Sequence, residues 1–172
     1  MEPCKLTASA AAKLIGERKL SCEELVRSCR NRIQLRDAEV RAWMHVEAEL
    51  AIRNARERDK SPAKGILHGL PIGVKDVIDT ADFPTTQNSP IYPSLRVGRD
   101  AACVAVARGS GALVLGKTDT VEFASTGRKA LSRNPHNLAH TPGGSSSGSG
   151  AAVADFMVPL AFGTQTGGSL IR

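Results

Sequence analysis

The sequence predicts an α/β fold, in which a mostly parallel or mixed sheet carries helices on its faces. Short apolar runs typical of buried strands alternate with helical segments after Gly65, whereas the chain before Gly65 is mainly helical in pattern. A length of 172 residues, 41% of them hydrophobic, suits one domain with a sizeable core. We therefore expect a single domain over residues 1–172, with a helical part over 1–64 and the first part of the core over 65–172.

Capping signals place two helices at the start of the chain. Thr7 is a suitable N-cap for a helix over Ala8–Glu17. Ser21 and Glu24 have the spacing of a capping box, which predicts a second helix that runs to about Arg36. The apolar side chains of this second helix recur at helical spacing and share one face: Cys22, Leu25, Val26, Cys29 and Ile33.

The later elements alternate between strand and helix. A short strand over Ala42–Val46 precedes a helix over Glu47–Lys60, whose outer positions are charged. Buried strands are then expected at Ile72–Lys75, Ala112–Leu115 and Val158–Phe162. Helices are expected at Asp100–Arg108 and near Ala151–Asp155, the second directly after a glycine-serine loop over Gly143–Gly150. Strands separated by helices favour parallel pairing, because a parallel connection has to cross the sheet.

Composition and charge exclude several classes of function. The net charge of +6 comes from basic residues interleaved with acidic ones, for instance between Glu47 and Lys60, so no concentrated basic face for nucleic acid is predicted. The sequence contains no run of 18 apolar residues, the length needed for a helix to cross a membrane. The first residues lack the features of a secretory signal. The four cysteines form no C-x-x-C pair. These features predict a cytoplasmic protein with neither a nucleic-acid nor a membrane partner.

No metal and no cofactor is predicted. His136 and His140 have the i, i+4 spacing of a helical metal site. Pro135 and Pro142 bracket the pair, however, and favour a loop in which no helix aligns the two rings.

Two segments match the sequence patterns of known serine nucleophiles but lack the other residues that those patterns require. Gly144–Gly148 fits G-x-S-x-G, but the triad of that motif needs a histidine after the serine, and His140 is the last histidine of the chain. Ser61–Lys64 fits S-x-x-K, but Pro62 places it in a polar turn without the companion S-D-N and K-T-G motifs.

Residues 111–118 match the phosphate-binding pattern G-x-x-x-x-G-K-[ST]. In a true P-loop, the residues between the glycines form a loop whose N–H groups face phosphate. Here these residues are Ala-Leu-Val-Leu, which favour burial as a strand. A P-loop nucleotide-binding protein is therefore a weak alternative.

Two glycine-serine segments and one lysine form the constellation that can carry chemistry. Lys75 ends the apolar run Ile72–Lys75, where burial would favour the neutral amine, a usable base. Such an amine can take a proton from a serine hydroxyl, directly or through a second hydroxyl, and Thr141–Ala154 supplies several serines. In Gly163–Arg172, the glycines before Ser169 allow backbone N–H groups to converge, as an oxyanion hole requires.

This constellation resembles the amidase signature family. Residues 143–154 read Gly-Gly-Ser-Ser-x-Gly-Ser-x-Ala-Ala-Val-Ala, and Gly-Thr-x-Thr-Gly-Gly-Ser follows, its serine 24 residues after Ser145. Upstream, Gly69-Leu-Pro-Ile-Gly-Val-Lys75-Asp76 is similar to the segment that carries the family's lysine. Asn134-Pro135 and Gly116-Lys117-Thr118 also look like family segments, which explains the P-loop match. The resemblance covers essentially the whole chain and implies the amidase-signature fold.

The resemblance also implies a Ser–cis-Ser–Lys triad. Ser169 would be the nucleophile that forms an acyl-enzyme with an amide carbonyl, Ser145 the bridging serine after a cis peptide bond, and Lys75 the base. Ser146 would support the triad, and backbone N–H groups of Thr166, Gly167, Gly168 and Ser169 would hold the oxyanion. Arg172 is a candidate partner for a substrate carboxylate. The implied partner is a small-molecule amide, and a homodimer of the full-length form stays open.

The sequence departs from the commonest family pattern in three places: Ser147, Gln165 and the pair Leu170-Ile171. They lie outside the triad and argue mildly against a glutamine-amidotransferase A-type subunit, which stays an alternative. Family members continue well beyond the nucleophile, whereas this sequence ends three residues after Ser169. We therefore expect the N-terminal part of an amidase, incomplete at its C-terminus, with a non-catalytic truncated remnant as the other interpretation.

Overall fold

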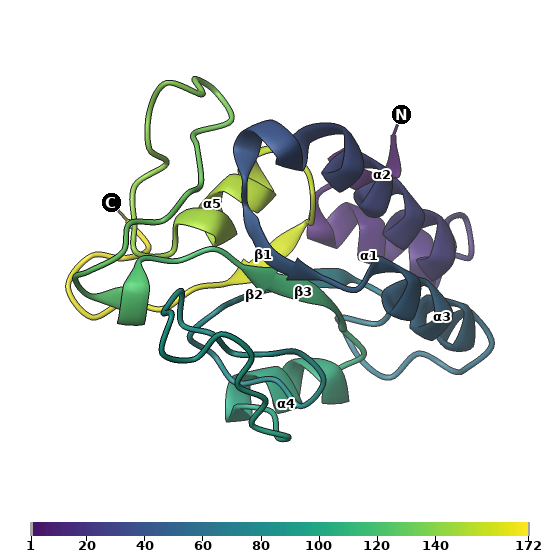
Figure 1. Cartoon of the computed structure of the whole chain (residues 1–172). Coiled ribbons are helices and arrows are strands. Elements are labelled where there is room, and N and C mark those ends of the chain that lie inside the picture. Colours follow the sequence, from purple (N-terminus) through teal and green to yellow (C-terminus); the bar gives the residue numbers. More distant parts are fainter. Residues whose placement is uncertain (1, 172) are drawn as a thin grey trace.

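The centre of the molecule is a four-stranded sheet in the order β1-β3-β2-β4 (Figure 1). β1 (Trp43–Val46) runs antiparallel to β3 (Leu113–Thr118), whereas β2 (Pro71–Lys75) is parallel to both β3 and β4 (Leu160–Phe162). This computed structural model describes residues 2–171. The predicted α/β fold with a mixed, mostly parallel sheet is confirmed.

Helices cover both faces of the sheet. They are α1 (Ala8–Gly16), α2 (Cys22–Val40), α3 (Ala48–Asp59), α4 (Ala102–Gly109) and α5 (Ser147–Ala154), with short 3-10 turns at Pro3–Lys5 and Glu122–Ala124. Buried residues of α1, α2, α3 and α5 form one apolar cluster with Leu113 and Leu115 of β3. Residues of α4 form a second cluster with Val74 and Val114, and Figure 1 shows α4 alone below the sheet.

The capping signals at the start of the chain act as predicted. Thr7 Oγ1 accepts a hydrogen bond from the backbone N–H of Ala10, and Ser21 with Glu24 forms the capping box of α2. α2 runs four residues beyond the predicted end at Arg36, to Val40. The side chain of Asp37 stabilises the chain reversal after it, because Oδ1 accepts the N–H of Ala42 at 2.7 Å.

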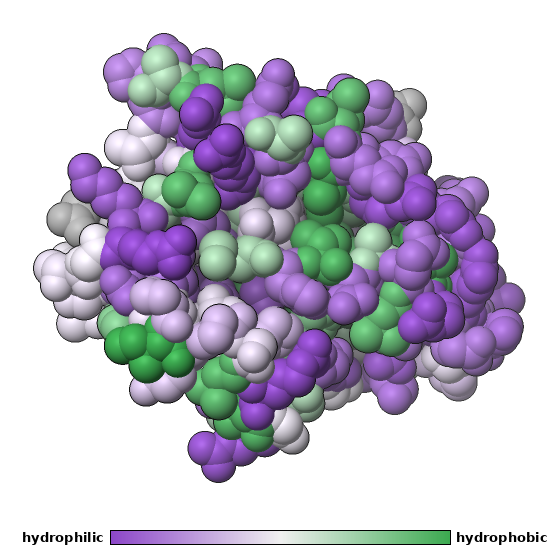
Figure 2. All heavy atoms as spheres, in the orientation of Figure 1, coloured by the Kyte–Doolittle hydropathy of each residue, from purple (hydrophilic) through white to green (hydrophobic). Residues whose placement is uncertain are grey.

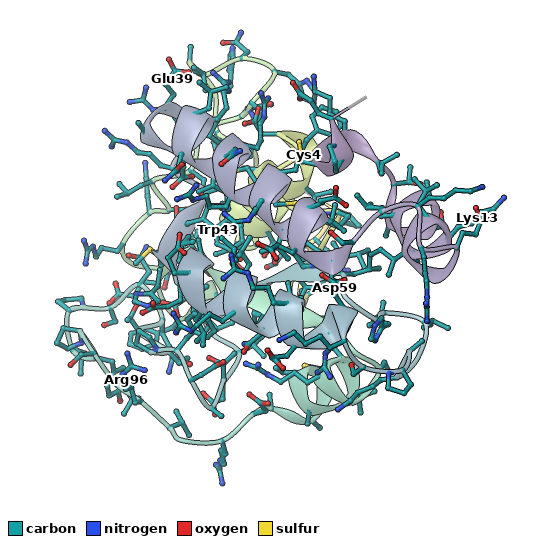
Figure 3. All side chains as sticks on the ribbon, turned by 90° about the vertical axis from the view of Figure 1, so that its right-hand side faces the viewer. Cys4, Lys13, Glu39, Trp43, Asp59 and Arg96 are labelled. Atoms are coloured by element: carbon teal, nitrogen blue, oxygen red, sulfur yellow. The ribbon has the colours of Figure 1, made fainter. Side chains whose placement is uncertain are left out.

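Carboxylates from two other segments bind α2 near both of its ends. Asp59, at the end of α3, accepts the backbone N–H groups of Cys22 and Glu23 at the beginning of α2, at 2.7 and 3.1 Å. Figure 3 shows Asp59 and Glu39 near opposite ends of α2. Toward the far end, Arg32 donates to the buried carboxylate of Asp155, which follows α5, at 2.9 Å. The helical part of the chain is thereby fixed against the helix that follows the serine-rich loop.

The bounds of several later elements differ from the prediction; α4, for instance, begins at Ala102 rather than at Asp100. β3 continues past Leu115 to Thr118, because its polar residues find buried partners and need no exposure. α5 begins at Ser147 rather than at Ala151, so half of the expected glycine-serine loop is helical. β4 begins at Leu160 rather than at Val158.

A β-bulge interrupts the pairing of β2 with β3. Ile72 pairs with Val114, but Gly73 pairs with Gly116, so Leu115 is an extra residue on β3. Because side chains alternate between the faces of a sheet, the extra residue reverses the alternation after it. Lys117 therefore shares the α4 face with Val74, rather than the face of Leu113 and Leu115.

Within residues 2–171, no helix has the combination of length and apolar character needed to cross a bilayer. On the face drawn in Figure 2, apolar residues are dispersed among hydrophilic ones.

The close approach of α5 to the sheet gives a first prediction. A Cβ at Gly148 would lie 2.3 Å from Ala42 O and 2.3 Å from Asp119 N, both backbone atoms, whereas a Cβ at Gly150 meets nothing within 4 Å. Gly148→Ala should therefore lower the free energy of unfolding by about 1–3 kcal/mol through overpacking. The matched control Gly150→Ala should raise it by roughly 0.5–1 kcal/mol through helix propensity. Urea unfolding of both variants checks this, and equal effects would contradict the proposed close packing.

Candidate functional site

The amine of Lys75 is the centre of the site. Lys75 is the last residue of β2, and its side chain is fully buried. Its Nζ donates to Ser145 Oγ at 2.8 Å, to Ser146 Oγ at 3.0 Å and to Thr164 Oγ1 at 2.8 Å. The three acceptors are all hydroxyl groups, so the amine is held in place without a carboxylate partner among residues 2–171.

Burial without a counter-ion changes the proton affinity of this amine. Desolvation lowers the pKa of Lys75 from 10.5 to about 8, because the charged ammonium form loses its hydration. Near neutral pH a useful fraction of the side chain is therefore the neutral amine, which can accept a proton.

Ser145 and Ser146 reach Lys75 from the turn that leads into α5. The peptide bond between Gly144 and Ser145 is cis, as the resemblance implied, and Ser145 O accepts the N–H of Val121 at 3.3 Å. Ser147 Oγ donates to Gly143 O at 2.8 Å, which closes the turn. The first helical residue thus fixes the two preceding hydroxyl groups in the interior, where both serines are buried.

Ser169 lies in a turn beside this serine pair. Its carbonyl oxygen accepts the N–H of Ser146 at 3.1 Å, and the residue is only 9% exposed. Gly168 next to it is buried, whereas Thr166 and Gly167 are exposed. The structure thus brings the segment of Ser169 against the segment of Ser145 and Ser146 through the backbone, and Arg172 lies outside the described residues.

Sequence reasoning missed Thr164 as a partner of Lys75. Thr164 completes the set of hydroxyl groups, and its backbone joins it to Ser146: Thr164 N donates to Ser146 Oγ at 3.2 Å, and Ser146 Oγ donates to Thr164 O at 3.1 Å. The available signal was its position just after the last apolar strand, at the same edge of the sheet as Lys75.

Sequence reasoning also missed a buried ion pair on the opposite face of the sheet. Lys117 Nζ lies 3.3 Å from Asp76 Oδ1, and both side chains are at most 1% exposed. Lys117 also donates to Thr85 Oγ1 at 2.7 Å and to Pro84 O at 3.1 Å. The lysine of the P-loop match is therefore fully engaged, and residues 113–118 of the match form a strand rather than a phosphate-binding loop.

Residues 2–171 contain no group of three or more histidine, cysteine, aspartate or glutamate side chains placed to hold an ion. His136 and His140 lie in an irregular segment, where Asn134 N donates to His140 O. What the site offers is one amine and a set of hydroxyl groups, which together can move a proton.

Comparison with known proteins identifies the relatives of the chain. A family model described as Amidase matches residues 24–172. The A-type subunit of the glutamyl-tRNA(Gln) amidotransferase of Mycobacterium leprae (strain TN) is 41% identical over 179 residues, which cover 98% of this chain and 36% of that relative. The native peptide amidase of Stenotrophomonas maltophilia is similar with a TM-score of 0.85 and 30% identity, over 91% of this chain and 35% of that one. A fatty acid amide hydrolase structure matches with a TM-score of 0.90 and 25% identity, over 97% of this chain and 31% of that one. The chain thus spans about a third of the length of these relatives.

The lowered pKa of Lys75 predicts a pH-dependent stability. The folded state holds this proton less tightly than the unfolded state does, so the cost of burying Lys75 is fully present below pH about 8 and fades as the pH rises to 10.5. Lys75→Met removes the titration. The variant's free energy of unfolding minus that of the parent should therefore fall by about 1–3 kcal/mol between pH 7 and pH 10.5. Urea unfolding across this range checks it; a constant difference would show that Lys75 titrates as an ordinary lysine.

Proposed function

The chain belongs to the amidase family, and on that premise we propose that its site hydrolyses a carboxylic amide to an acid and an amine or ammonia through a serine acyl-enzyme. The observation that carries the proposal is the buried amine of Lys75, surrounded by hydroxyl groups and lacking a carboxylate. An amine in this setting suits a base that acts on a serine, because it can be neutral near pH 8.

In the proposed reaction, Ser169 Oγ attacks the carbonyl carbon of the amide. Its proton moves to Ser145 Oγ while the proton of Ser145 moves to the neutral amine of Lys75. The tetrahedral intermediate then expels the leaving nitrogen, which takes a proton back from Lys75 through Ser145. Water attacks the acyl-enzyme by the same route, so that acid is released and Ser169 is restored.

The glycine-rich turn before the nucleophile is the proposed oxyanion hole. Backbone N–H groups from Thr166 to Ser169 would donate to the developing negative charge on the carbonyl oxygen. Gly167 and Gly168 carry no side chain that could block an approaching carbonyl. Ser146 supports the arrangement, because its hydroxyl contacts Lys75 and the backbone of Thr164 together.

A second candidate function is that of a glutamine-amidotransferase A-type subunit. It is favoured by the curated relatives, among them the corresponding A-type protein of Acidothermus cellulolyticus at 43% identity over 173 residues. The departures from the family pattern at Ser147, Gln165 and Leu170-Ile171 argue mildly against this candidate. Such a protein would use the same triad to release ammonia from glutamine, so the two candidates differ in substrate and partners rather than in chemistry.

We infer a reducing, cytoplasmic setting and a small-molecule amide as the substrate. The free thiols Cys4, Cys22, Cys29 and Cys103 support this setting. A homodimer of a full-length form remains part of the proposal.

Labelling with a fluorophosphonate tests the nucleophile. In the full-length protein the probe should modify Ser169, and Ser169→Ala should abolish the modification, because a serine activated by a base reacts where ordinary serines do not. Ser125→Ala, at an exposed serine outside the site, is the matched control and should leave labelling unchanged. Peptide mapping by mass spectrometry locates the adduct. Undiminished labelling of Ser169→Ala would remove Ser169 from the proposed mechanism.

Ammonia release separates the candidate functions. The full-length protein should release ammonia from a simple aliphatic amide, and Lys75→Ala should lower this rate by at least about 100-fold, as expected for loss of a general base. Release from glutamine and from no simple amide would favour the amidotransferase candidate. Absence of hydrolysis of both amides would favour the non-catalytic alternative.

A further inference from the structure

Two fully buried lysines occupy neighbouring strands of the sheet with opposite kinds of partner. Lys75 on β2 contacts hydroxyl groups only, whereas Lys117 on β3 pairs with the carboxylate of Asp76 at 3.3 Å. Both lysines are 0% exposed. Burial alone therefore does not distinguish them; the presence or absence of a counter-ion does.

The bulge in β3 is what separates the two amines. Lys75 pairs in register with Thr118, and Val74 pairs with Lys117. Thr118 Oγ1 lies 2.7 Å from Ser149 Oγ of α5, so Lys75 and Thr118 share the α5 face. Lys117 contacts Pro84 and Thr85, which follow a residue of the α4 cluster, Phe83. The amines thus lie on opposite faces of the sheet.

Asp76 is the carboxylate closest to Lys75 along the chain, and it is fully occupied elsewhere. Both of its oxygens accept the N–H of Thr86 at 3.1 Å, and Oδ2 also accepts from Thr86 Oγ1. The backbone N–H of Asp76 donates to Thr118 O at 3.0 Å, which continues the sheet past Lys75. The carboxylate is therefore held on the α4 side with its charge balanced by Lys117.

We propose that Asp76 and Lys117 form a positioning pair for Lys75: Lys117 cancels the charge of Asp76 on the far face of the sheet and leaves the Lys75 amine without a counter-ion. This inference deepens the proposed function. It rests on that function only where the neutral amine of Lys75 is taken to act as the base. An unbalanced Asp76 carboxylate would favour the ammonium form of Lys75, whereas an unbalanced Lys117 ammonium would disfavour it.

The other two buried acids of the described residues, Asp119 and Asp155, have donors of their own. After β3, the Asp119 carboxylate accepts from Leu131 N at 2.6 Å and from Ser132 N at 2.8 Å. At the end of α5, Asp155 accepts from Arg32 at 2.9 Å. Residues 160–171, which include β4 and Thr164, contain no ionisable side chain. The Asp76–Lys117 pair is thus the charged element joined most directly to the strand of Lys75.

The pKa of Lys75 in charge-altered variants tests the proposal without any need for catalysis. The chain contains eight lysines, so the side-chain signals of protein labelled with ¹³C-lysine can be resolved by NMR, and the Lys75 signal assigned by its loss in Lys75→Met. Lys117→Met should raise the pKa of Lys75 by about 1, and Asp76→Asn should lower it by about 1. The double variant should return it to within a few tenths of the parent value.

A merely structural role of the pair would not shift the pKa of Lys75 in opposite directions in Lys117→Met and Asp76→Asn. Thr85→Val is the matched control: it removes an acceptor of Lys117 without changing a charge, and should leave the pKa of Lys75 in place. Shifts of the same sign, or no shift in either single variant, would overturn the proposal.

Each single variant leaves one buried charge unbalanced and is expected to be less stable, so folding is checked by circular dichroism. Where a single variant does not fold, the other single variant decides by the sign of its shift. Where neither folds, the double variant decides: a pKa of Lys75 moved by 1 or more overturns the proposal, and an unmoved one supports it. Opposite shifts without fluorophosphonate labelling of Ser169 would retain the pair and reject the proposed hydrolysis. Labelling of Ser169 without those shifts would retain the proposed hydrolysis and reject the pair.

Discussion

A buried amine that has hydroxyl partners and no carboxylate partner is the interaction on which the rest of the site depends. Taking Lys75 out of water costs free energy, which appears as a pKa lowered to about 8. Hydroxyl groups satisfy its hydrogen-bonding capacity without restoring the charged form as a carboxylate would. The same contacts therefore keep the side chain in place and leave it able to accept a proton.

The surrounding fold supplies those hydroxyl groups from segments that are distant in sequence. Ser145 and Ser146 come from the turn before α5, and Thr164 follows β4. The strand that carries Lys75, β2, lies between β3 and β4 in the sheet. The sheet thus gathers the amine and its three hydroxyl partners at one edge, and the bulge in β3 places the second buried lysine on the other face.

Much of this arrangement could be predicted from the sequence, because the signals are local. The capping box at Ser21 marks the start of α2, and apolar runs mark β2 and β3. The burial of Lys75 follows from the apolar residues before it. The start of α5 at Ser147 could not be predicted, since glycine and serine disfavour helices and the contacts that hold this turn against the sheet, among them the close approach of Gly148 and the hydrogen bonds of Ser149, form only in the fold.

The ion pair of Asp76 with Lys117 was beyond sequence reasoning for a different reason. A strict alternation along β3 places Lys117 on the face of Leu115, and only the extra residue at the bulge moves it to the other face. A bulge is set by the pairing of two strands rather than by either strand's own residues. Contacts that depend on such pairing appear only in the folded structure.

The rate at which a fluorophosphonate modifies Ser169, measured as a function of pH, tests the central claim most directly. If Lys75 is the base, the rate rises with pH through an apparent pKa near 8, and Lys75→Met gives a slow, flat profile. A rate that does not depend on pH in the parent protein, or an unchanged profile in Lys75→Met, would contradict the role of the buried amine.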